Sequence, residues 1–178
     1  MLKRIFAFII LAIAGFFMFA SMQPDDFRVT RSAKIMAPAS EIFPYVNNFH
    51  NWETWSPWAK LDPNAKTSFE GENSGVGSIM HWESGNMEVG AGSSTITEAK
   101  LNEYIKMQLN FLKPMKNTAT SEFSLQENGG ETTITWSMYG KNDLIAKAMH
   151  VVFDCEKMVG GMFDKGLGNL KTVVEGKK

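Results

Sequence analysis

Apolar and polar side chains alternate along three segments in the second half of the chain, residues 105–111, 118–125 and 133–139. A period of two puts successive side chains on opposite faces of a β-strand, so each segment predicts a strand with one covered and one solvated face. Such strands are typical of an antiparallel sheet. The sequence Asn128-Gly129-Gly130 predicts a tight turn that joins the last two strands as a hairpin.

Four more strands are expected earlier in the chain, where short apolar-rich runs are separated by turn residues. They cover residues 27–35, 65–71, 78–84 and 90–99. Glycine and asparagine gather between the second and third of these runs, and again at Gly85-Asn86, where the chain is expected to turn. The sequence therefore predicts about seven strands.

Two short helical segments are expected between the first strand and the others. Residues 37–41 are typical of a helix start, although Pro44 should bend that helix or delay its beginning. A second short helix or turn covers residues 52–60 and is interrupted at Pro57. These segments would cross one end of the sheet.

The C-terminal segment has helical periodicity. Apolar residues recur at the spacing of a helix face from Met158 to Val173, and residues 144–153 form a shorter helical candidate. Four glycines interrupt the long helix, and each costs about 1 kcal/mol relative to alanine. We expect them to permit close approach of the helix to the sheet, or to leave room for a ligand. They are Gly160, Gly161, Gly166 and Gly168.

The order of these elements predicts an α+β fold. A curved antiparallel sheet of about seven strands would wrap around the long C-terminal helix, with two short helices after the first strand. Residues 27–178 form this single domain, residues 23–26 form a short linker, and residues 1–22 form a separate N-terminal segment.

The N-terminal segment contains an apolar run, Ile5–Met22, preceded by Lys3 and Arg4. Eighteen helical residues span about 27 Å, close to the thickness of a bilayer's hydrocarbon core. We interpret the run as an uncleaved single-pass transmembrane anchor, with the N-terminus cytoplasmic and the domain exported. The alternative is a cleaved signal peptide, for which Ala12-Ile13-Ala14 offers a cleavage pattern. A buried core helix is disfavoured because the run has no polar face.

Composition excludes several classes of function. The 18 basic and 19 acidic residues give no basic field for nucleic acid. A single cysteine, Cys155, excludes a disulfide scaffold. His150, Asp154 and Cys155 are loosely spaced like metal ligands but fall short of a usual zinc set, so no metal is expected. The sequence has no phosphate-binding loop, dinucleotide fingerprint or nucleophile elbow, and no cofactor is expected.

The sequence resembles the START-related, polyketide cyclase-like superfamily (SRPBCC, the helix-grip fold). The matching stretches are residues 31–38, the Trp52–Trp58 segment with Asp62-Pro63, Gly75-Val76-Gly77-Ser78 with Trp82, and Phe163–Lys171. The tryptophan cluster and the closing Gly-Leu-x-x-Leu-Lys stretch are similar to those of a membrane-anchored bacterial branch. The resemblance implies a cavity between sheet and long helix that holds an apolar small molecule or lipid. It implies no particular activity.

Apolar residues on the covered face and on the long helix are the candidate ligand contacts. Methionine is well represented among them, and a methionine-rich wall can accommodate varied apolar guests. Trp52, Trp55 and Trp58 would form either an aromatic lip over the cavity mouth or a lid packed on the open end of the sheet. Their i, i+3, i+6 spacing would not put all three on one narrow face of an α-helix. The candidates are Trp55, Trp58, Trp82, Met107, Leu109, Phe111, Phe123, Trp136, Met138, Met162 and Phe163.

His81 and Glu83 are the weak candidates for acid–base chemistry, because they lie two residues apart on one strand and so share a face. If Met80 and Trp82 are the buried pair, His81 and Glu83 point to solvent. In the opposite register they would enter the cavity. Tyr104 is a further cavity candidate.

Three hypotheses follow. The first is a membrane-anchored binding domain for a hydrophobic small molecule or lipid, without turnover. The second is a cyclase or dehydratase that acts on an apolar substrate. The third is a non-catalytic interaction domain that partners a membrane protein. The protein partner is not determined by the sequence.

Overall fold

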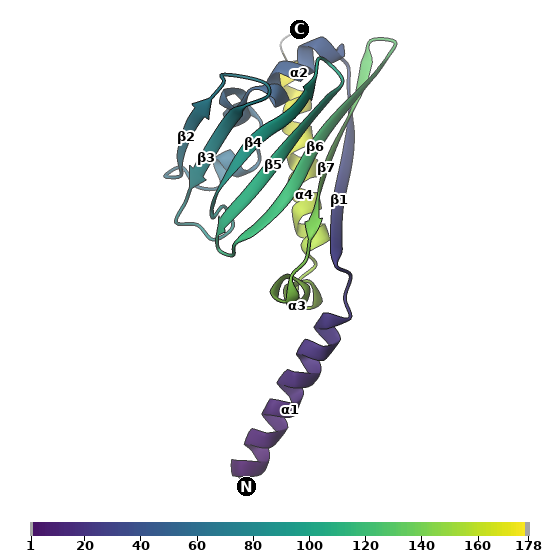
Figure 1. Ribbon diagram of the computed structural model, residues 1–178. Coiled ribbons are helices and arrows are strands. Elements are labelled where there is room, and N and C mark those ends of the chain that lie inside the picture. The colour runs from purple at the N-terminus through teal and green to yellow at the C-terminus, as the bar shows by residue number, and fades with distance from the viewer. Residues whose placement is uncertain (1, 177–178) are drawn as a thin grey trace.

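The computed structural model describes residues 2–176 and has a seven-stranded antiparallel sheet that curves around one long helix (Figure 1). The predicted α+β architecture is confirmed. The helices are α1 (Leu2–Ser21), α2 (Ala39–Asn47), α3 (Leu144–Val152) and α4 (Cys155–Glu175), with 3-10 helices η1 (Phe49–Thr54) and η2 (Trp58–Lys60). The strands are β1 (Asp26–Ile35), β2 (Lys66–Gly71), β3 (Ser78–Glu83), β4 (Ala91–Lys100), β5 (Tyr104–Lys113), β6 (Asn117–Asn128) and β7 (Glu131–Lys141).

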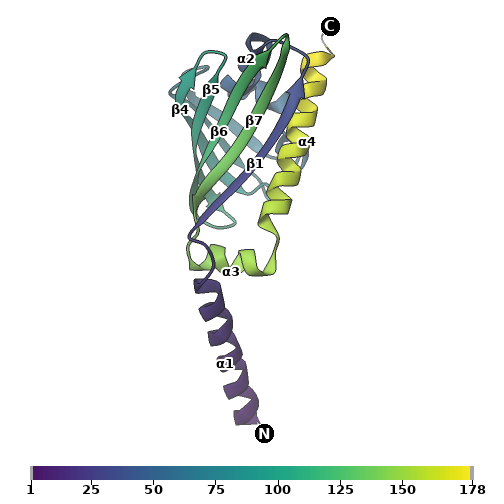
Figure 2. The same cartoon turned by 90° about the vertical axis from the view of Figure 1, so that its right-hand side faces the viewer.

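Strands β2 to β7 form a meander, and β1 pairs with β7, which gives the order β1-β7-β6-β5-β4-β3-β2. The Asn128–Glu131 turn joins β6 and β7 as predicted. Gly129 and Gly130 both have positive φ, at 62° and 84°, which the tight hairpin turn requires. Helix α4 lies along β1 on the concave side of the sheet (Figure 2).

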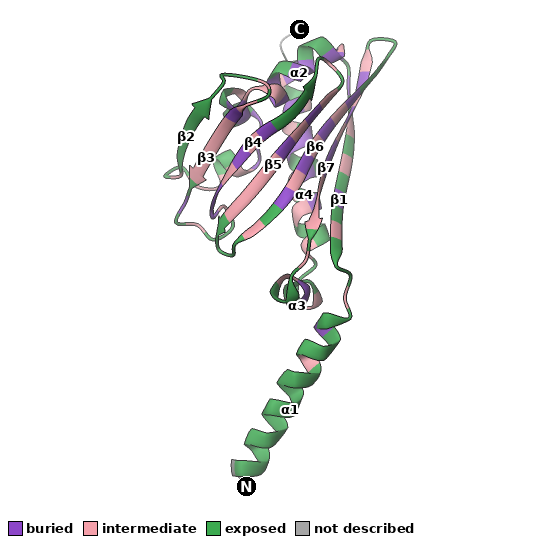
Figure 3. Cartoon of the chain, viewed as in Figure 1, coloured by how far each residue is buried: buried purple, intermediate pink, exposed green. Residues whose placement is uncertain are grey.

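The domain has two ends, which we call proximal and distal. The proximal end carries α1, α3, the β3–β4 loop and the β5–β6 turn. The distal end carries α2, the β4–β5 turn and the β6–β7 turn (Figure 1). On β5 and β7 the inward-facing residues are buried toward the distal end and only partly buried toward the proximal end, whereas β4 is buried in its proximal half and exposed in its distal half (Figure 3).

Helix α1 projects from the proximal end, away from the domain, and nearly all of its residues are exposed (Figure 3). Within residues 2–176, Lys3–Ser21 is the one stretch of helix long and apolar enough to cross a bilayer, and 6% of it is buried. The same properties suit a signal sequence. Helix α2 begins at Ala39 and contains Pro44.

Candidate functional site

Inward-facing side chains on the concave side form rows across the sheet. Ile105, Phe123 and Trp136 are directly paired in a distal row, and all three are buried. Two residues nearer the proximal end, Met107 is buried and Met138 is only partly buried. The rows continue with Leu109, paired with Ser94 and Ala119, and then with Phe111, paired with Gly92. Along β5 the inward-facing side chains thus become less covered toward the proximal end, while their small partners Ser94 and Ala119 stay buried.

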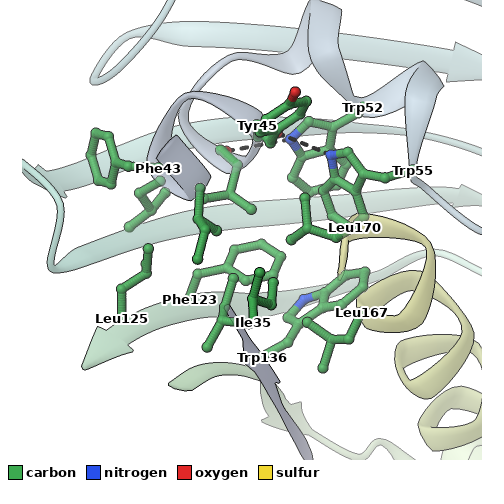
Figure 4. Close-up of a cluster of buried hydrophobic side chains, with 14 of the residues drawn as sticks. Ile35, Phe43, Tyr45, Trp52, Trp55, Phe123, Leu125, Trp136, Leu167 and Leu170 are labelled. Carbon is green, nitrogen blue, oxygen red and sulfur yellow. Dashed lines mark hydrogen bonds between the residues drawn. The ribbon is translucent and has the colours of Figure 1, made fainter. Parts of the chain in front are cut away.

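An aromatic cluster fills the distal half of the space between sheet and α4 (Figure 4). Trp136 stacks on Phe163 of α4 with ring centroids 4.0 Å apart and an angle of 5° between the rings. Trp55 is fully buried and lies 5.5 Å from Trp136. The buried indole N–H groups are paired: Trp55 donates to the Tyr45 carbonyl at 3.0 Å and Trp136 donates to Ser121 Oγ at 2.9 Å. This half is therefore a packed core rather than an empty cavity.

Of the two alternatives for the tryptophan-rich segment, the structure has the lid packed on the sheet and not the lip over a cavity mouth. Trp52 and Trp55 enter the interior, and Trp52 lies 6.1 Å from the Phe123 ring. Trp58, half-buried at the start of η2, lies 5.8 Å from Trp136 and 6.2 Å from Phe163. The segment covers apolar sheet surface that α4 alone leaves open.

Apolar side chains stay partly exposed on the concave side at its proximal half. We call these five residues the proximal apolar surface: Trp82, Leu109, Phe111, Met138 and Met162. Trp82 lies edge-on to Phe111 at 6.0 Å and donates its indole N–H to the Val89 carbonyl at 3.1 Å. Gly92 makes this position of the indole possible, because a Cβ there would lie 2.6 Å from Trp82 Cζ2. Ser94, deeper on the same strand, is fully buried and its hydroxyl has no hydrogen-bond partner.

The predicted ligand contacts therefore divide into two groups. Trp55, Met107, Phe123, Trp136 and Phe163 are buried in the core, where a ligand could reach them only by displacing protein side chains. Trp58 and the proximal apolar surface retain exposed area. Their role as ligand contacts stays a prediction.

Two hollows stand out among the described residues, and both lie elsewhere. One, of about 520 Å³, opens at the proximal ends of β1, β5, β6 and β7 and is lined by Arg28, Gln108 and Tyr139, which project from the outer face of the sheet. The other, of about 420 Å³, lies beside α2. Both are open to solvent, and neither includes a residue of the proximal apolar surface.

His81 and Glu83 lie on the outer face of β3, because Met80 packs against the core from the alternate positions of the strand. His81 Nε2 is 3.4 Å from Glu70 Oε2, and Glu83 Oε1 is 3.1 Å from Lys113 Nζ. Both acids in these pairs are mainly exposed. The structure thus has the register in which this pair points away from the interior.

Tyr104 also lies on the outer face, which corrects its placement in a cavity. It belongs to a polar cluster around Glu122 that the sequence analysis missed. Burial, with Glu122 nearby, raises the pKa of Tyr104. A hydrogen bond to Glu122 raises the pKa of Tyr139, and the Arg28 guanidinium lies 4.2 Å from the centre of the Tyr139 ring. The alternation that placed Ile105 and Phe123 inside also places Tyr104 and Glu122 outside.

Arg31 is a second feature that the sequence analysis missed. It occupies an inward position on edge strand β1 and binds α4 through Glu156 at 2.8 Å and Asp164 at 3.2 Å. The hydrogen bond that Arg31 donates to Glu156 raises the pKa of the guanidinium above its ordinary value. Gly160 makes room for Arg31, since a Cβ there would lie 2.0 Å from Arg31 Nη2. The sequence did contain a signal for this contact: two acidic residues lie eight positions apart on α4, with a glycine between them that leaves room for a side chain.

The glycines of α4 differ in what surrounds them, which predicts opposite effects of substitution. Gly166 packs tightly, because a Cβ there would lie 3.0 Å from both Pro57 Cδ and Trp136 Cζ3, whereas Gly161 and Gly168 have nothing within 4 Å. We expect Gly161→Ala and Gly168→Ala each to stabilise the domain by about 1 kcal/mol. Gly166→Leu should destabilise it by about 1–3 kcal/mol through overpacking. Thermal unfolding followed by circular dichroism measures both, and equal effects at all three positions would contradict this assignment.

Around Cys155, no metal site is assembled. Burial raises the pKa of its thiol. Within residues 2–176, no three histidine, cysteine, aspartate or glutamate side chains converge as metal ligands would.

Comparisons with known proteins agree with this geometry. The profile of the family described as polyketide cyclase / dehydrase and lipid transport matches residues 26–175. No curated protein matches the sequence. Among solved structures, the fold is similar to protein MLL2253 from Mesorhizobium loti, with a TM-score of 0.63 and 12% identity over 85% of this chain and 99% of that one.

Two further structures have the same fold. The Aha1 dimer from Colwellia psychrerythraea gives a TM-score of 0.60 and 14% identity over 84% of this chain and 96% of that one. DynU16, a protein in the dynemicin biosynthetic locus, gives a TM-score of 0.60 and 15% identity over 87% of this chain and 49% of that one. At these identities the likeness concerns the fold alone.

Proposed function

The chain belongs to the polyketide cyclase / dehydrase and lipid transport family, and from this premise we propose that it is a membrane-anchored domain that binds an apolar small molecule or lipid without converting it. The family fold commonly binds hydrophobic ligands or performs cyclase-type chemistry. The proposed site is the proximal apolar surface, formed by its four residues on the sheet and by Met162 of α4.

The observation that carries this proposal is the change in burial along the inward faces of β5 and β7. Phe123 and Trp136 in the distal row are 0% and 3% exposed, whereas Leu109 and Phe111 on the neighbouring strand are only partly covered. Some apolar side chains face inward yet stay accessible to water. A ligand that covers them lowers the free energy by about 25 cal/mol for each Å² of apolar surface removed from water. The unpaired Ser94 hydroxyl would offer one polar contact to a ligand that reached it.

The position of α1 suggests that the ligand would come from the membrane. It leaves the domain at the proximal end (Figure 1). Leu109 and Phe111, the less covered inward residues of β5, lie toward the same end of that strand. We propose that α1 spans the bilayer, with the N-terminus cytoplasmic and the domain exported, because Lys3 and Arg4 precede the apolar run. The bilayer would then lie next to the open end of the site.

Binding without turnover is favoured over catalysis by the positions of the three residues considered for acid–base chemistry. His81, Glu83 and Tyr104 all lie on the outer face, where no group would touch a ligand held under α4. A general acid or base has to lie within hydrogen-bonding reach of the reacting group.

Met162→Glu tests the site. A carboxylate placed among apolar contacts loses hydration when a ligand covers it, so we expect roughly tenfold weaker binding or more. The measurement is cross-linking of a diazirine-bearing fatty acid to the full chain in vesicles, with labelled residues mapped by mass spectrometry. Labelling of Leu109 and Met138 should fall relative to labelling of α1, which serves as the internal reference.

Leu101→Glu is the matched control. Leu101 is 78% exposed on the β4–β5 turn at the distal end, so this change should leave the labelling of Leu109 and Met138 unaltered. If the native chain shows no labelling at these residues while α1 is labelled, the binding proposal is wrong. The packed distal interior would then favour the alternative of a tethered interaction domain for a membrane protein.

A further inference from the structure

Helix α3 presents an exposed apolar stripe. Ile145 and Val152 are 58% and 61% exposed, and Met149 lies between them at the spacing of one helix face. Leu144 beside this stripe and Phe153 at the helix C-cap are exposed as well. No charged residue interrupts the stripe. The exposed His150 of the last turn lies to one side of it, with its ring 6.3 Å from that of Phe27.

The opposite side of α3 is fixed to the domain and to the end of α1. Lys147 is buried and forms an ion pair with Asp25, which holds the pKa of that carboxyl below its usual range. Lys147 Nζ also donates to the Ser21 carbonyl at 3.3 Å. The Asn142 backbone N–H donates to the Asp25 carbonyl at 2.7 Å. The start of α3 and the end of α1 are thus held together, and the two helices are in contact.

This attachment constrains the height of α3 above a bilayer that α1 spans. Residues 22–25 separate α1 from β1, and four residues reach at most about 14 Å even when fully extended. Helix α3 lies across the end of α1 rather than parallel to it (Figure 2). Phe19 and Met22, at the end of α1 that leads to β1, are exposed as well.

Exposed apolar residues also gather on the two proximal connections of the sheet. Met87 lies in the β3–β4 loop, and Leu112 and Met115 lie at the β5–β6 turn. Strand pairing brings these connections to the same end, since Ala91 pairs with Lys113. The apolar exposure thus extends beyond α3 across the proximal end.

We propose that the exposed face of α3, together with Phe153, lies in the interface of the lipid bilayer and docks the domain on the membrane. The inference rests on the proposed anchor, because α1 sets the position of the bilayer. Partitioning of apolar side chains drives docking, and the exposed stripe of α3 carries no basic residue, so anionic lipid is not required. Docking orients the open end of the proximal apolar surface toward the lipid.

Single-cysteine labelling of the full chain in phosphatidylcholine vesicles tests this docking. Cys155→Ser removes the one native thiol, and separate Ile145→Cys, Val152→Cys, Leu11→Cys and Leu101→Cys changes carry a polarity-sensitive nitrobenzoxadiazole dye. We expect quenching by shallow spin-labelled lipid at positions 145 and 152, quenching by deep spin-labelled lipid at position 11, and none at position 101. Adding anionic lipid should leave quenching at 145 and 152 unchanged.

The outcomes separate the docking from the anchor. Quenching at position 11 with none at 145 and 152 would overturn the docking and leave the anchor in place. No quenching at any position would refute the anchor, and the docking with it. Dyes at 145 and 152 that are shielded from water but insensitive to spin-labelled lipid would indicate a protein contact and overturn the lipid assignment. As a second check, Ile145→Glu with Val152→Glu should reduce quenching of a Phe153→Cys probe at least threefold without changing the melting temperature.

Discussion

Trp136→Ala is expected to destabilise the domain by about 3–5 kcal/mol, the range observed when a large buried aromatic side chain is truncated. Trp136 is 3% exposed, and its ring contacts Trp55, Phe123 and Phe163 together. Removing it leaves a cavity that these rings cannot fill without leaving their own positions. It also removes the hydrogen bond that the indole N–H donates to Ser121 Oγ. Chemical unfolding of the full chain in mild detergent, followed by circular dichroism, measures the loss.

Trp136→Phe is the control, because it retains a ring against Phe163 and should cost less than half as much. The comparison also bears on function. A loss of less than about 1 kcal/mol for Trp136→Ala would show that the distal interior is loosely packed. A ligand could then enter the distal half as well, contrary to the filled core described above.

The sheet was predictable because its strands alternate so regularly. Ile105 and Phe123 face inward while Lys106 and Glu122 face outward, and a period of two permits no other arrangement once one face is covered. The β6–β7 hairpin was predictable as well, because turn residues separate the two alternating segments. The long helix α4 followed from apolar residues at helical spacing.

The filling of the interior was not predictable from these patterns. On an α-helix, positions i, i+3 and i+6 cover an arc of about 120°, so Trp52, Trp55 and Trp58 were not expected to share one narrow face. The structure instead has a 3-10 helix over Phe49–Thr54, and with three residues per turn such positions lie above one another. A local change in helix type thus brings Trp52 and Trp55 to the sheet together. The side chains that cover the apolar sheet surface beside α4 therefore come from this segment.

The glycines of α4 show a similar limit. Close approach explains Gly160 beside Arg31 and Gly166 between Pro57 and Trp136. Gly161 and Gly168 lie on open helix surface, and nothing in the structure explains them. Sequence spacing alone could not separate the two pairs, because the distinction depends on which side chains from other elements reach the helix.

Introducing two arginines into α1, Leu11→Arg with Ala14→Arg, is expected to abolish membrane insertion. Each arginine near the centre of a spanning helix costs about 2.5–3.5 kcal/mol, so the pair costs about 5–7 kcal/mol. Both positions are exposed, and little of α1 is buried against the domain, so the fold should be unaffected. The chain with both arginines should be released from membranes by alkaline carbonate, whereas the native chain should stay in the membrane pellet.

Leu11→Ala with Ala14→Leu is the matched control, because it keeps the segment apolar and should leave the protein in the pellet. The mass of the native protein separates the two interpretations of α1. An intact N-terminus together with resistance to carbonate supports the anchor, since a cleaved signal peptide would leave a shorter and soluble product. If the native chain is intact and yet released by carbonate, α1 does not span the bilayer. The proximal end of the domain would then have no fixed membrane beside it, and the ligand would have to reach the site from water.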